Sequence, residues 1–173
     1  MGMFKMNNTD NNLSDKTTSL QELLASQQTI LLSTASGNSV PDLSVAPFVR
    51  DQAGCFYIFI SELAMHTANL LNNPQASVMF IRTESESNNL FARERAVFNC
   101  KARKIERSEP LYTIQLKALQ DKFGEVVSLL QTLTDFHLFS LCPESGRYIM
   151  GFGQAYMINI KEGKVSPLNK NSS

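Results

Sequence analysis

The stretch Ala96-Val97-Phe98-Asn99-Cys100-Lys101-Ala102-Arg103-Lys104-Ile105-Glu106 alternates between apolar and polar side chains over almost its whole length. Phe98, Cys100 and Ala102 fall on one face, while the residues between them are polar or charged. Because successive side chains of a β-strand point to opposite faces of the sheet, this alternation predicts a long strand with one buried and one solvated face.

The segments on either side of this strand predict more strands and a few helices. Apolar patterning and turn residues predict strands at 29–35, 40–50, 55–61, 76–82, 136–141 and 147–160, with a turn at 143–146. Helical spacing predicts helices at 20–27, 65–72 and 109–133, the last broken near Gly124. Pro41 and Pro47 predict that the second strand bends or lies at an edge. Short successive strands with few long crossovers predict an α+β fold built on a closed antiparallel barrel.

Length and composition bound the domain organisation. The chain has 173 residues, of which 43% are hydrophobic, so one domain with a real core is expected. The polar, apolar-poor ends predict a disordered segment at 1–16 and a flexible tail at 163–173, around a barrel domain at 17–162. The first residues lack an apolar stretch of signal-peptide length, which predicts a cytoplasmic protein.

Charge and cysteine usage exclude several classes of protein. The formal net charge is zero, so neither nucleic acid nor an anionic membrane is expected as the main partner. No apolar run approaches the roughly 20 residues that span a bilayer. The three cysteines, Cys55, Cys100 and Cys142, are widely spaced and lie in apolar runs. Their odd number and the absence of a CxxC pair predict buried free thiols, without a disulfide frame or a thiolate zinc site.

Four features carry possible binding chemistry. The two glycines of 151–156 predict a bulge, a barrel corner or a close approach to a ligand. Arg93 and Arg95 suit a phosphate or propionate, or form a solvated charge run. His66, with Asn69 one turn later, lies near a predicted helix N-terminus, where it would bind an anion, ligate a metal or face solvent. Asp135 is a turn residue that would matter if it oriented a histidine.

Six segments in this order resemble the haem-utilisation proteins of the HutZ and HugZ type, within the superfamily of pyridoxamine 5′-phosphate oxidase-like split barrels. The resemblance covers about three quarters of the chain, and its specificity lies in the order of the segments rather than in any one of them. The segments are Ser44-Val45-Ala46-Pro47-Phe48-Val49, His66-Thr67-Ala68-Asn69-Leu70 with Asn73-Pro74, Asn89-Leu90-Phe91-Ala92-Arg93-Glu94-Arg95, Phe123-Gly124-Glu125, Leu133-Thr134-Asp135-Phe136 and Gly151-Phe152-Gly153-Gln154-Ala155-Tyr156.

This resemblance implies a six-stranded antiparallel split barrel, a two-fold homodimer and a flat cofactor at the dimer interface. The wider superfamily binds FMN, whereas the HutZ-like branch binds haem, and some of its members open the porphyrin oxidatively to release iron. Those members use an axial histidine in a C-terminal segment, supported by an aspartate of the partner subunit. Asp135 is the counterpart of that aspartate, but no histidine follows His137 in this sequence. FMN-using relatives carry Ser-Arg-Lys where this chain has Ala64, Met65 and His66.

Three functions follow as alternatives from the resemblance. In the first, a haem-utilisation protein, Arg93, Arg95 or His66 would contact propionates, with Asp135 and the 151–156 segment, including Gln154 and Tyr156, at the interface. In the second, an FMN-dependent oxidoreductase, backbone groups at Ser44, Ala46 and Ser61 would meet the flavin, and His66 with Arg82 would hold its phosphate. The third is a non-catalytic dimer that has lost its cofactor.

Overall fold

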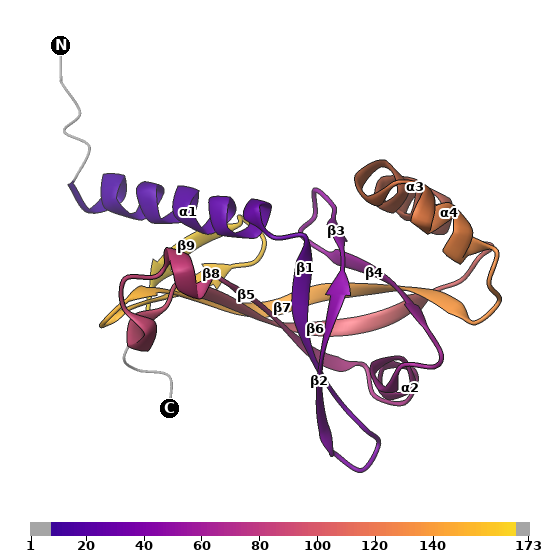
Figure 1. The fold of residues 1–173 in the computed structure, drawn as a ribbon. Helices are drawn as coiled ribbons and strands as arrows, with labels where there is room; N and C mark the ends of the chain where they lie inside the picture. The colour runs from indigo at the N-terminus through magenta and orange to yellow at the C-terminus, as the bar shows by residue number, and fades with distance from the viewer. Residues whose placement is uncertain (1–7, 169–173) are drawn as a thin grey trace. The chain divides into compact units, whose positions relative to one another are not determined.

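The computed structural model describes residues 8–168, which contain four α-helices, two 3₁₀ turns and nine strands (Figure 1). In chain order these are α1 (Asn8–Ser26), β1 (Thr29–Ala35), β2 (Pro41–Pro47), β3 (Val49–Arg50), β4 (Phe56–Ser61), α2 (Met65–Asn72), β5 (Gln75–Ile81), η1 (Glu84–Glu86), η2 (Leu90–Ala92), β6 (Arg95–Ile105), α3 (Pro110–Phe123), α4 (Glu125–Gln131), β7 (Phe136–Gly151), β8 (Gln154–Asn159) and β9 (Lys164–Pro167).

The strands pair in the order β2-β1-β5-β6-β7-β4-β3, and β8 joins β7 to β9. The pairs β1–β2, β1–β5, β3–β4, β4–β7, β7–β8 and β8–β9 are all antiparallel. This confirms the expected antiparallel α+β fold with flanking helices, with nine strands where the resemblance implied six. The expected full closure of the barrel is wrong for the described residues, because β2 and β3 lie at opposite ends of the strand order and the sheet is open. The chain folds as two compact units, and the divisions between them fall within the sequences of β5, β6 and β7. The first unit holds 8–27, 80–97 and 145–168, and the second holds 28–79 and 98–144.

The core of the second unit is built from strands and from the α3–α4 pair. The ring of Phe56 contacts the rings of Phe48 and Phe98 edge to face, at centroid distances of 5.9 and 5.5 Å. A neighbouring cluster joins Leu116 and Val127 of the two helices to buried strand and helix residues, namely Val49, Tyr57, Ile105, Tyr112, Leu119 and Leu138. Burial of each such side chain contributes about 1.5–3 kcal/mol to folding.

Two predicted breaks in this unit are confirmed. The second predicted strand ends at Pro47 as β2, which pairs with β1 at one end of the strand order. After Phe48 the chain changes partner, because the short β3 pairs with β4. The long helix breaks at Gly124, whose φ of +77° lies in the left-handed region that favours glycine. The chain therefore turns at Gly124, and α4 lies beside α3 (Figure 1).

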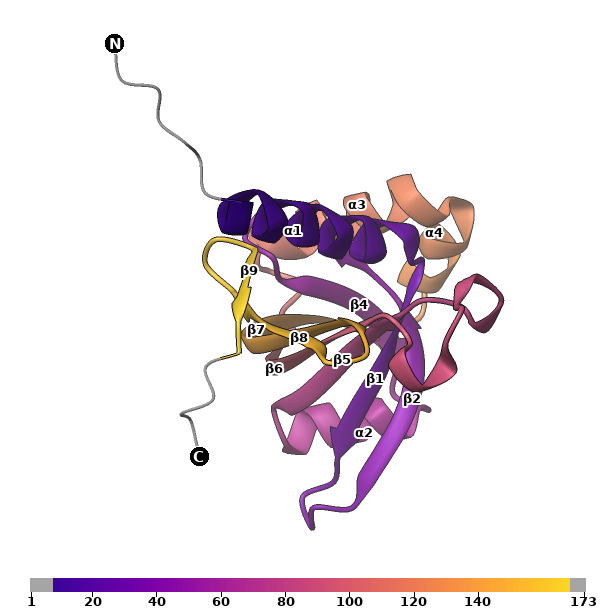
Figure 2. The ribbon, with the colours of Figure 1, turned by 90° about the vertical axis from the view of Figure 1, so that its left-hand side faces the viewer.

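The first unit is held by contacts between α1 and β9, which lie side by side in Figure 2. The amide of Gln21 donates to the Gly163 carbonyl at 3.0 Å, and the Val165 N–H donates to the Thr17 hydroxyl at 3.2 Å. The helix was expected at 20–27, but it begins at Asn8. Likewise 164–167 is a strand within the expected tail. These two bonds hold Gly163 and Val165, which belong to the expected tail, against the helix. Residues 1–7 and 169–173 of those expected ends lie outside the described part.

The predicted turn at 143–146 is wrong, because β7 runs unbroken through it for 16 residues. The chain turns instead at Phe152 and Gly153, where Gly153 has a φ of +68°. A register shift between Ile149 and Gly151 marks a β-bulge just before that turn. The bulge predicted from the two glycines of 151–156 is therefore confirmed, and the strand ends there rather than at Pro143.

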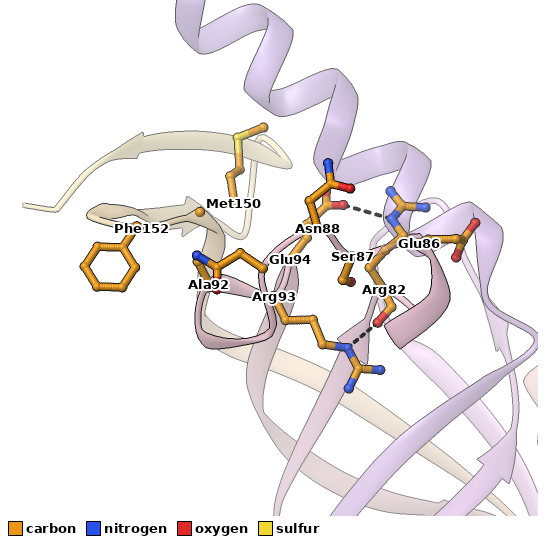
Figure 3. A pocket seen from close by; sticks show the side chains of 11 residues that line it. Arg82, Glu86, Ser87, Asn88, Ala92, Arg93, Glu94, Met150 and Phe152 are labelled. Atoms are coloured by element: carbon orange, nitrogen blue, oxygen red, sulfur yellow. Dashed lines mark hydrogen bonds and ion pairs between the residues drawn. The ribbon is translucent and has the colours of Figure 1, made fainter.

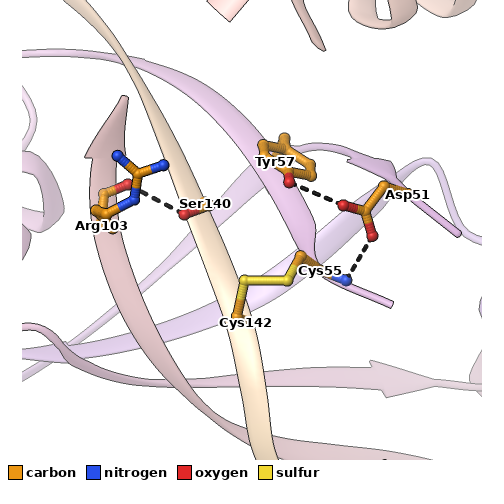
Figure 4. Close-up of a disulfide and its surroundings, with 6 residues drawn as sticks. All are labelled: Asp51, Cys55, Tyr57, Arg103, Ser140 and Cys142. Carbon is orange, nitrogen blue, oxygen red and sulfur yellow. Dashed lines mark hydrogen bonds between the residues drawn. A yellow bond between two sulfur atoms is a disulfide. The ribbon is translucent and has the colours of Figure 1, made fainter. Parts of the chain in front are cut away.

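The prediction of three free thiols is wrong for Cys55 and Cys142, which form a disulfide between the start of β4 and β7 (Figure 4). Phe56 pairs with Leu141 in the ladder, so the two cysteines occupy the next positions outward on adjacent strands. Asp51 fixes the same corner. Its carboxylate accepts from the Cys55 N–H at 2.9 Å and from the Tyr57 hydroxyl at 2.8 Å. Sequence spacing hides this pairing, because 87 residues separate the cysteines.

Cys100 alone fits the prediction, since it is a buried free thiol. Burial raises its pKa to about 12, so the thiol stays protonated and unreactive at neutral pH. Within residues 8–168, no helix combines the length and the apolar character needed to cross a membrane.

Candidate functional site

Asp135 is held in place by the end of β4 and the turn that follows it. The Ser61 hydroxyl donates to Asp135 Oδ2 at 2.7 Å, and the Glu62 N–H donates to the Asp135 carbonyl at 2.8 Å. The same Ser61 oxygen accepts from the Leu63 N–H at 3.1 Å. Among the described residues, Asp135 Oδ1 has no hydrogen-bond donor. The half-buried carboxylate is thus fixed in direction and keeps one oxygen for a further donor.

The first turn of α2 is tied to the same serine. The Thr67 hydroxyl donates to the Ser61 carbonyl at 2.6 Å, which fixes the helix start next to the Ser61–Asp135 pair. His66, the neighbour of Thr67, is half-buried. Burial lowers the pKa of the His66 imidazole, and the nearby Asp42 carboxylate opposes that shift only in part. At neutral pH the ring is therefore uncharged, which is the form that ligates metals.

Other predicted positions of the second unit hold the fold together. Asn69 is 4% exposed, and its amide donates to the Thr34 hydroxyl at 2.9 Å. The Ser44 hydroxyl makes a long contact of 3.4 Å with the Leu32 carbonyl, and Ala46 is buried. Asn69 thus already has a structural partner, and a cofactor role for these three residues stays a prediction.

In the first unit, a partly buried carboxylate, that of Glu94, lies between an arginine and a tyrosine. Arg82 Nε donates to Glu94 Oε2 at 2.9 Å, and the Tyr148 hydroxyl donates to Glu94 Oε1 at 2.5 Å. The Arg82 and Glu94 side chains are 23% and 19% exposed. The hydrogen bond to Glu94 raises the pKa of Arg82, and burial, followed by that carboxylate, raises the pKa of Tyr148. The Arg82 guanidinium is therefore already paired with the Glu94 carboxylate.

Arg93 lies beside this group, and its ion pair is longer than that of Arg82. Its Nε donates to the Arg82 carbonyl at 2.5 Å, and its Nη1 contacts the exposed Glu84 carboxylate at 3.4 Å. Both arginines and Glu94 line a pocket of about 320 Å³, whose lining also includes Phe152 of the β7–β8 turn (Figure 3). Phe152 is 80% exposed. The pocket thus offers one available guanidinium and one exposed aromatic ring.

The remaining predicted residues of this unit do not line that pocket. Arg95 Nη1 donates to the Arg93 carbonyl at 2.8 Å and so supports the Arg93 backbone. Gln154 follows the β7–β8 turn at the start of β8, beside Gly151. The Lys16 ammonium lies 5.3 Å from the centre of the Tyr156 ring, in a cation–π contact. The structure therefore brings Arg82 with Arg93, and Ser61 with Asp135, into direct contact.

Sequence reasoning missed Glu94, Tyr148 and Phe152. Glu94 lies between the two arginines of the quoted motif but pairs with Arg82, 12 residues earlier, so its sequence neighbours did not signal this ion pair. Tyr148 and Phe152 carried no signal either, because their roles depend on the course of β7 and its turn. Among the described residues, no three His, Cys, Asp or Glu side chains gather closely enough to hold a metal ion.

These features define the class of the protein: an antiparallel split-barrel fold with candidate small-molecule sites in loops and at strand ends. Residues 17–150 match the family described as pyridoxamine 5′-phosphate oxidase. The chain belongs to this pyridoxamine 5′-phosphate oxidase family.

Two bacterial relatives are similar over most of the chain. The chain is 39% identical over 140 residues to heme oxygenase HutZ of Vibrio cholerae serotype O1. The matched residues cover 81% of this chain and 79% of the relative. The crystal structure of HutZ, named a heme storage protein, superposes with a TM-score of 0.70 at 38% identity, over 73% of this chain and 89% of that one. Campylobacter jejuni ChuZ superposes with a TM-score of 0.78 at 31% identity, over 92% of this chain and 66% of ChuZ.

Proposed function

We propose that this protein binds haem at an interface between two copies of the chain and serves in haem-iron utilisation. The relatives named for heme oxygenase and heme storage activity support haem rather than FMN as the cofactor. Bound haem would supply an iron that activates oxygen, while the protein supplies the axial ligand, the hydrogen bonds to it and the polarity of the pocket.

The observation that carries this proposal is the anchored Asp135 carboxylate. A ligating imidazole donates its second ring N–H to a carboxylate in many metal sites, which orients the ring and makes it more basic. Ser61 fixes Asp135 Oδ2 at 2.7 Å, so Oδ1 can accept such an N–H. This agrees with the role that the family resemblance assigns to an aspartate at this position.

The described residues also fit the propionate groups of haem. A guanidinium binds a carboxylate through two parallel N–H bonds, and Arg93 has to release only its 3.4 Å contact with Glu84 to do so. Glu84 is 73% exposed, so that ion pair contributes little to stability. Arg82 and Glu94 would hold Arg93 in position through the Arg82 carbonyl rather than bind the cofactor themselves.

Two copies are needed because the pocket in one copy is small for a porphyrin. Its volume of about 320 Å³ lies at the lower end of the range for sites that take drug-sized ligands. Strand β2 offers an apolar face for a second copy, since Leu43 and Val45 are 70% and 55% exposed between inward-facing residues. Exposed apolar stripes of this kind mark interaction surfaces.

Titration of the purified chain with hemin is expected to give a saturable shift of the Soret band. Arg93→Gln should weaken hemin binding roughly tenfold, because a charge-assisted hydrogen bond to a propionate is lost. Lys101→Gln is the matched control, since Lys101 is an exposed cation on β6 outside the pocket. An unshifted Soret band, with the bands of bound oxidised flavin appearing on titration with FMN, would favour the FMN-dependent oxidoreductase instead.

The L43D/V45D double variant is expected to convert a dimer into a monomer, measured by light scattering after gel filtration. Two charges placed on the β2 face would have to be desolvated in an interface. The control is Ile114→Asp, because Ile114 is 60% exposed on α3 and lies outside that face. A monomeric wild-type chain, or an unchanged dimer in L43D/V45D, would contradict the interface on β2.

A further inference from the structure

A pocket in the second unit is lined by none of the residues proposed above to bind haem, although Ile105 and Tyr112 belong to the core cluster around α3 and α4. It has a volume of about 400 Å³ and is bounded by the end of β6, the first turn of α3 and the first residues of β7. The lining residues are Lys104, Ile105, Glu106, Arg107, Ser108, Tyr112, Phe136 and His137. The pocket therefore combines an apolar floor with charged groups at its rim.

Tyr112 gives the first sign of a ligand. Its side chain is 8% exposed, and its hydroxyl is buried without a hydrogen-bond partner among the described residues. A buried hydroxyl left unpaired costs about 1–3 kcal/mol, so such groups in folded proteins usually have a partner, which can be water or a ligand. Tyr112 lines the pocket, but its hydroxyl oxygen is itself buried, so a molecule bound there supplies the missing partner once the neighbouring side chains shift to admit it.

The charges around the pocket leave one cation without a carboxylate. Lys104 pairs with Glu106 at 3.7 Å, and His137 Nε2 pairs with the Glu62 carboxylate. Arg107 donates only to the Leu133 carbonyl at 3.1 Å, and its guanidinium carbon lies 5.7 Å from the centre of the Tyr112 ring. Within the described part of the chain, Arg107 thus keeps donors for an anion beside the buried hydroxyl.

We propose that this pocket binds a small carboxylate with an apolar body. Arg107 would hold the carboxylate, Ile105 and Phe136 would contact the body, and the Tyr112 hydroxyl would complete a hydrogen bond with a polar atom of the ligand or with a water that it orders. Charge favours an anion, and the apolar floor favours a ring or short chain over a bare inorganic ion. This site does not depend on haem binding.

Benzoate is the probe, measured by calorimetric titration of the full chain, with inorganic phosphate and benzyl alcohol as charge-only and ring-only comparisons. Benzoate should bind at least about tenfold more tightly than either comparison, and Arg107→Gln should weaken it by about the same factor. Lys117→Gln, on the exposed face of α3 and outside the pocket, should leave the affinity unchanged. Equal binding of phosphate and benzoate would overturn the proposal.

Tyr112→Phe tests the role of the unpaired hydroxyl. This variant should weaken benzoate binding and leave the unfolding midpoint of the free protein unchanged or higher, because the lost hydroxyl has no partner in the free protein. A lower midpoint would show that the hydroxyl is already paired, and unchanged benzoate affinity would show that it does not serve the ligand. Either result would overturn its assignment to this site.

Discussion

Removing the Cys55–Cys142 disulfide is expected to lower the free energy of unfolding by about 4–5 kcal/mol. The bond closes a loop across 87 residues, and cross-linking so long a loop removes many conformations from the unfolded chain. A protein of this size is stable by roughly 5–15 kcal/mol, so the loss would be a large part of the total. Guanidinium denaturation of the oxidised protein, the reduced protein and a C55A/C142A variant measures this difference.

The double variant supplies its own control for the reductant. Dithiothreitol should destabilise the wild-type chain but leave C55A/C142A unchanged, since Cys100 is a free thiol in both. Cys100 should also resist a thiol reagent until the protein unfolds, because it is buried and its pKa is raised to about 12. Labelling of Cys55 in the native, unreduced protein would show that the bridge does not form.

The disulfide bears on where the protein works. Disulfides persist in oxidising compartments and are uncommon in the cytosol, where thiol systems reduce them. The cytoplasmic location remains the prediction from the sequence. If that prediction holds, the chain would work largely in its reduced and less stable form, and the difference measured above is the relevant one.

Local sequence patterns predicted those strands and helices whose ends are set by residues close by in the sequence. The 65–72 helix, the β6 alternation and the break at Gly124 depend on nearby residues, so the sequence was sufficient for them. The extent of α1 and the existence of β9 depend on contacts 142 and 148 residues apart in sequence, through Gln21 with Gly163 and Thr17 with Val165. Composition contains no information about such partners.

The residues of the candidate site show the same contrast between what nearby sequence can predict and what depends on distant contacts. Arg93 was predicted because a guanidinium suits a propionate, and Asp135 because the family resemblance places a supporting aspartate there; both roles remain predictions. The Ser61–Asp135 bond joins residues 74 positions apart, and the Glu94–Tyr148 bond spans 54. Both bonds depend on which strands become neighbours. Sequence reasoning therefore named the chemical groups but could not show which of them are fixed in place and which remain available.

Substituting His66 is expected to have a larger effect on haem binding than substituting any supporting residue. This sequence contains two histidines, so a histidine ligand from this chain is either His66 or His137. His137 is engaged with the Glu62 carboxylate, whereas burial lowers the pKa of His66 below its usual value of 6.5 and keeps the ring neutral. Haem binding should therefore persist at pH 7 and weaken only when the pH falls below that lowered pKa.

Visible and resonance Raman spectra of hemin complexes test this assignment in three variants. His66→Ala should abolish the spectrum of a histidine-ligated haem, while His137→Ala should retain it. Asp135→Asn should retain the ligand but weaken binding by roughly 10- to 100-fold, because a carboxylate that orients an imidazole contributes on that scale. Since Ser61 holds Asp135 through Oδ2, Ser61→Ala should reproduce part of that loss. A histidine-type spectrum that survives in His66→Ala and disappears in His137→Ala would assign the iron to the other histidine and overturn this arrangement.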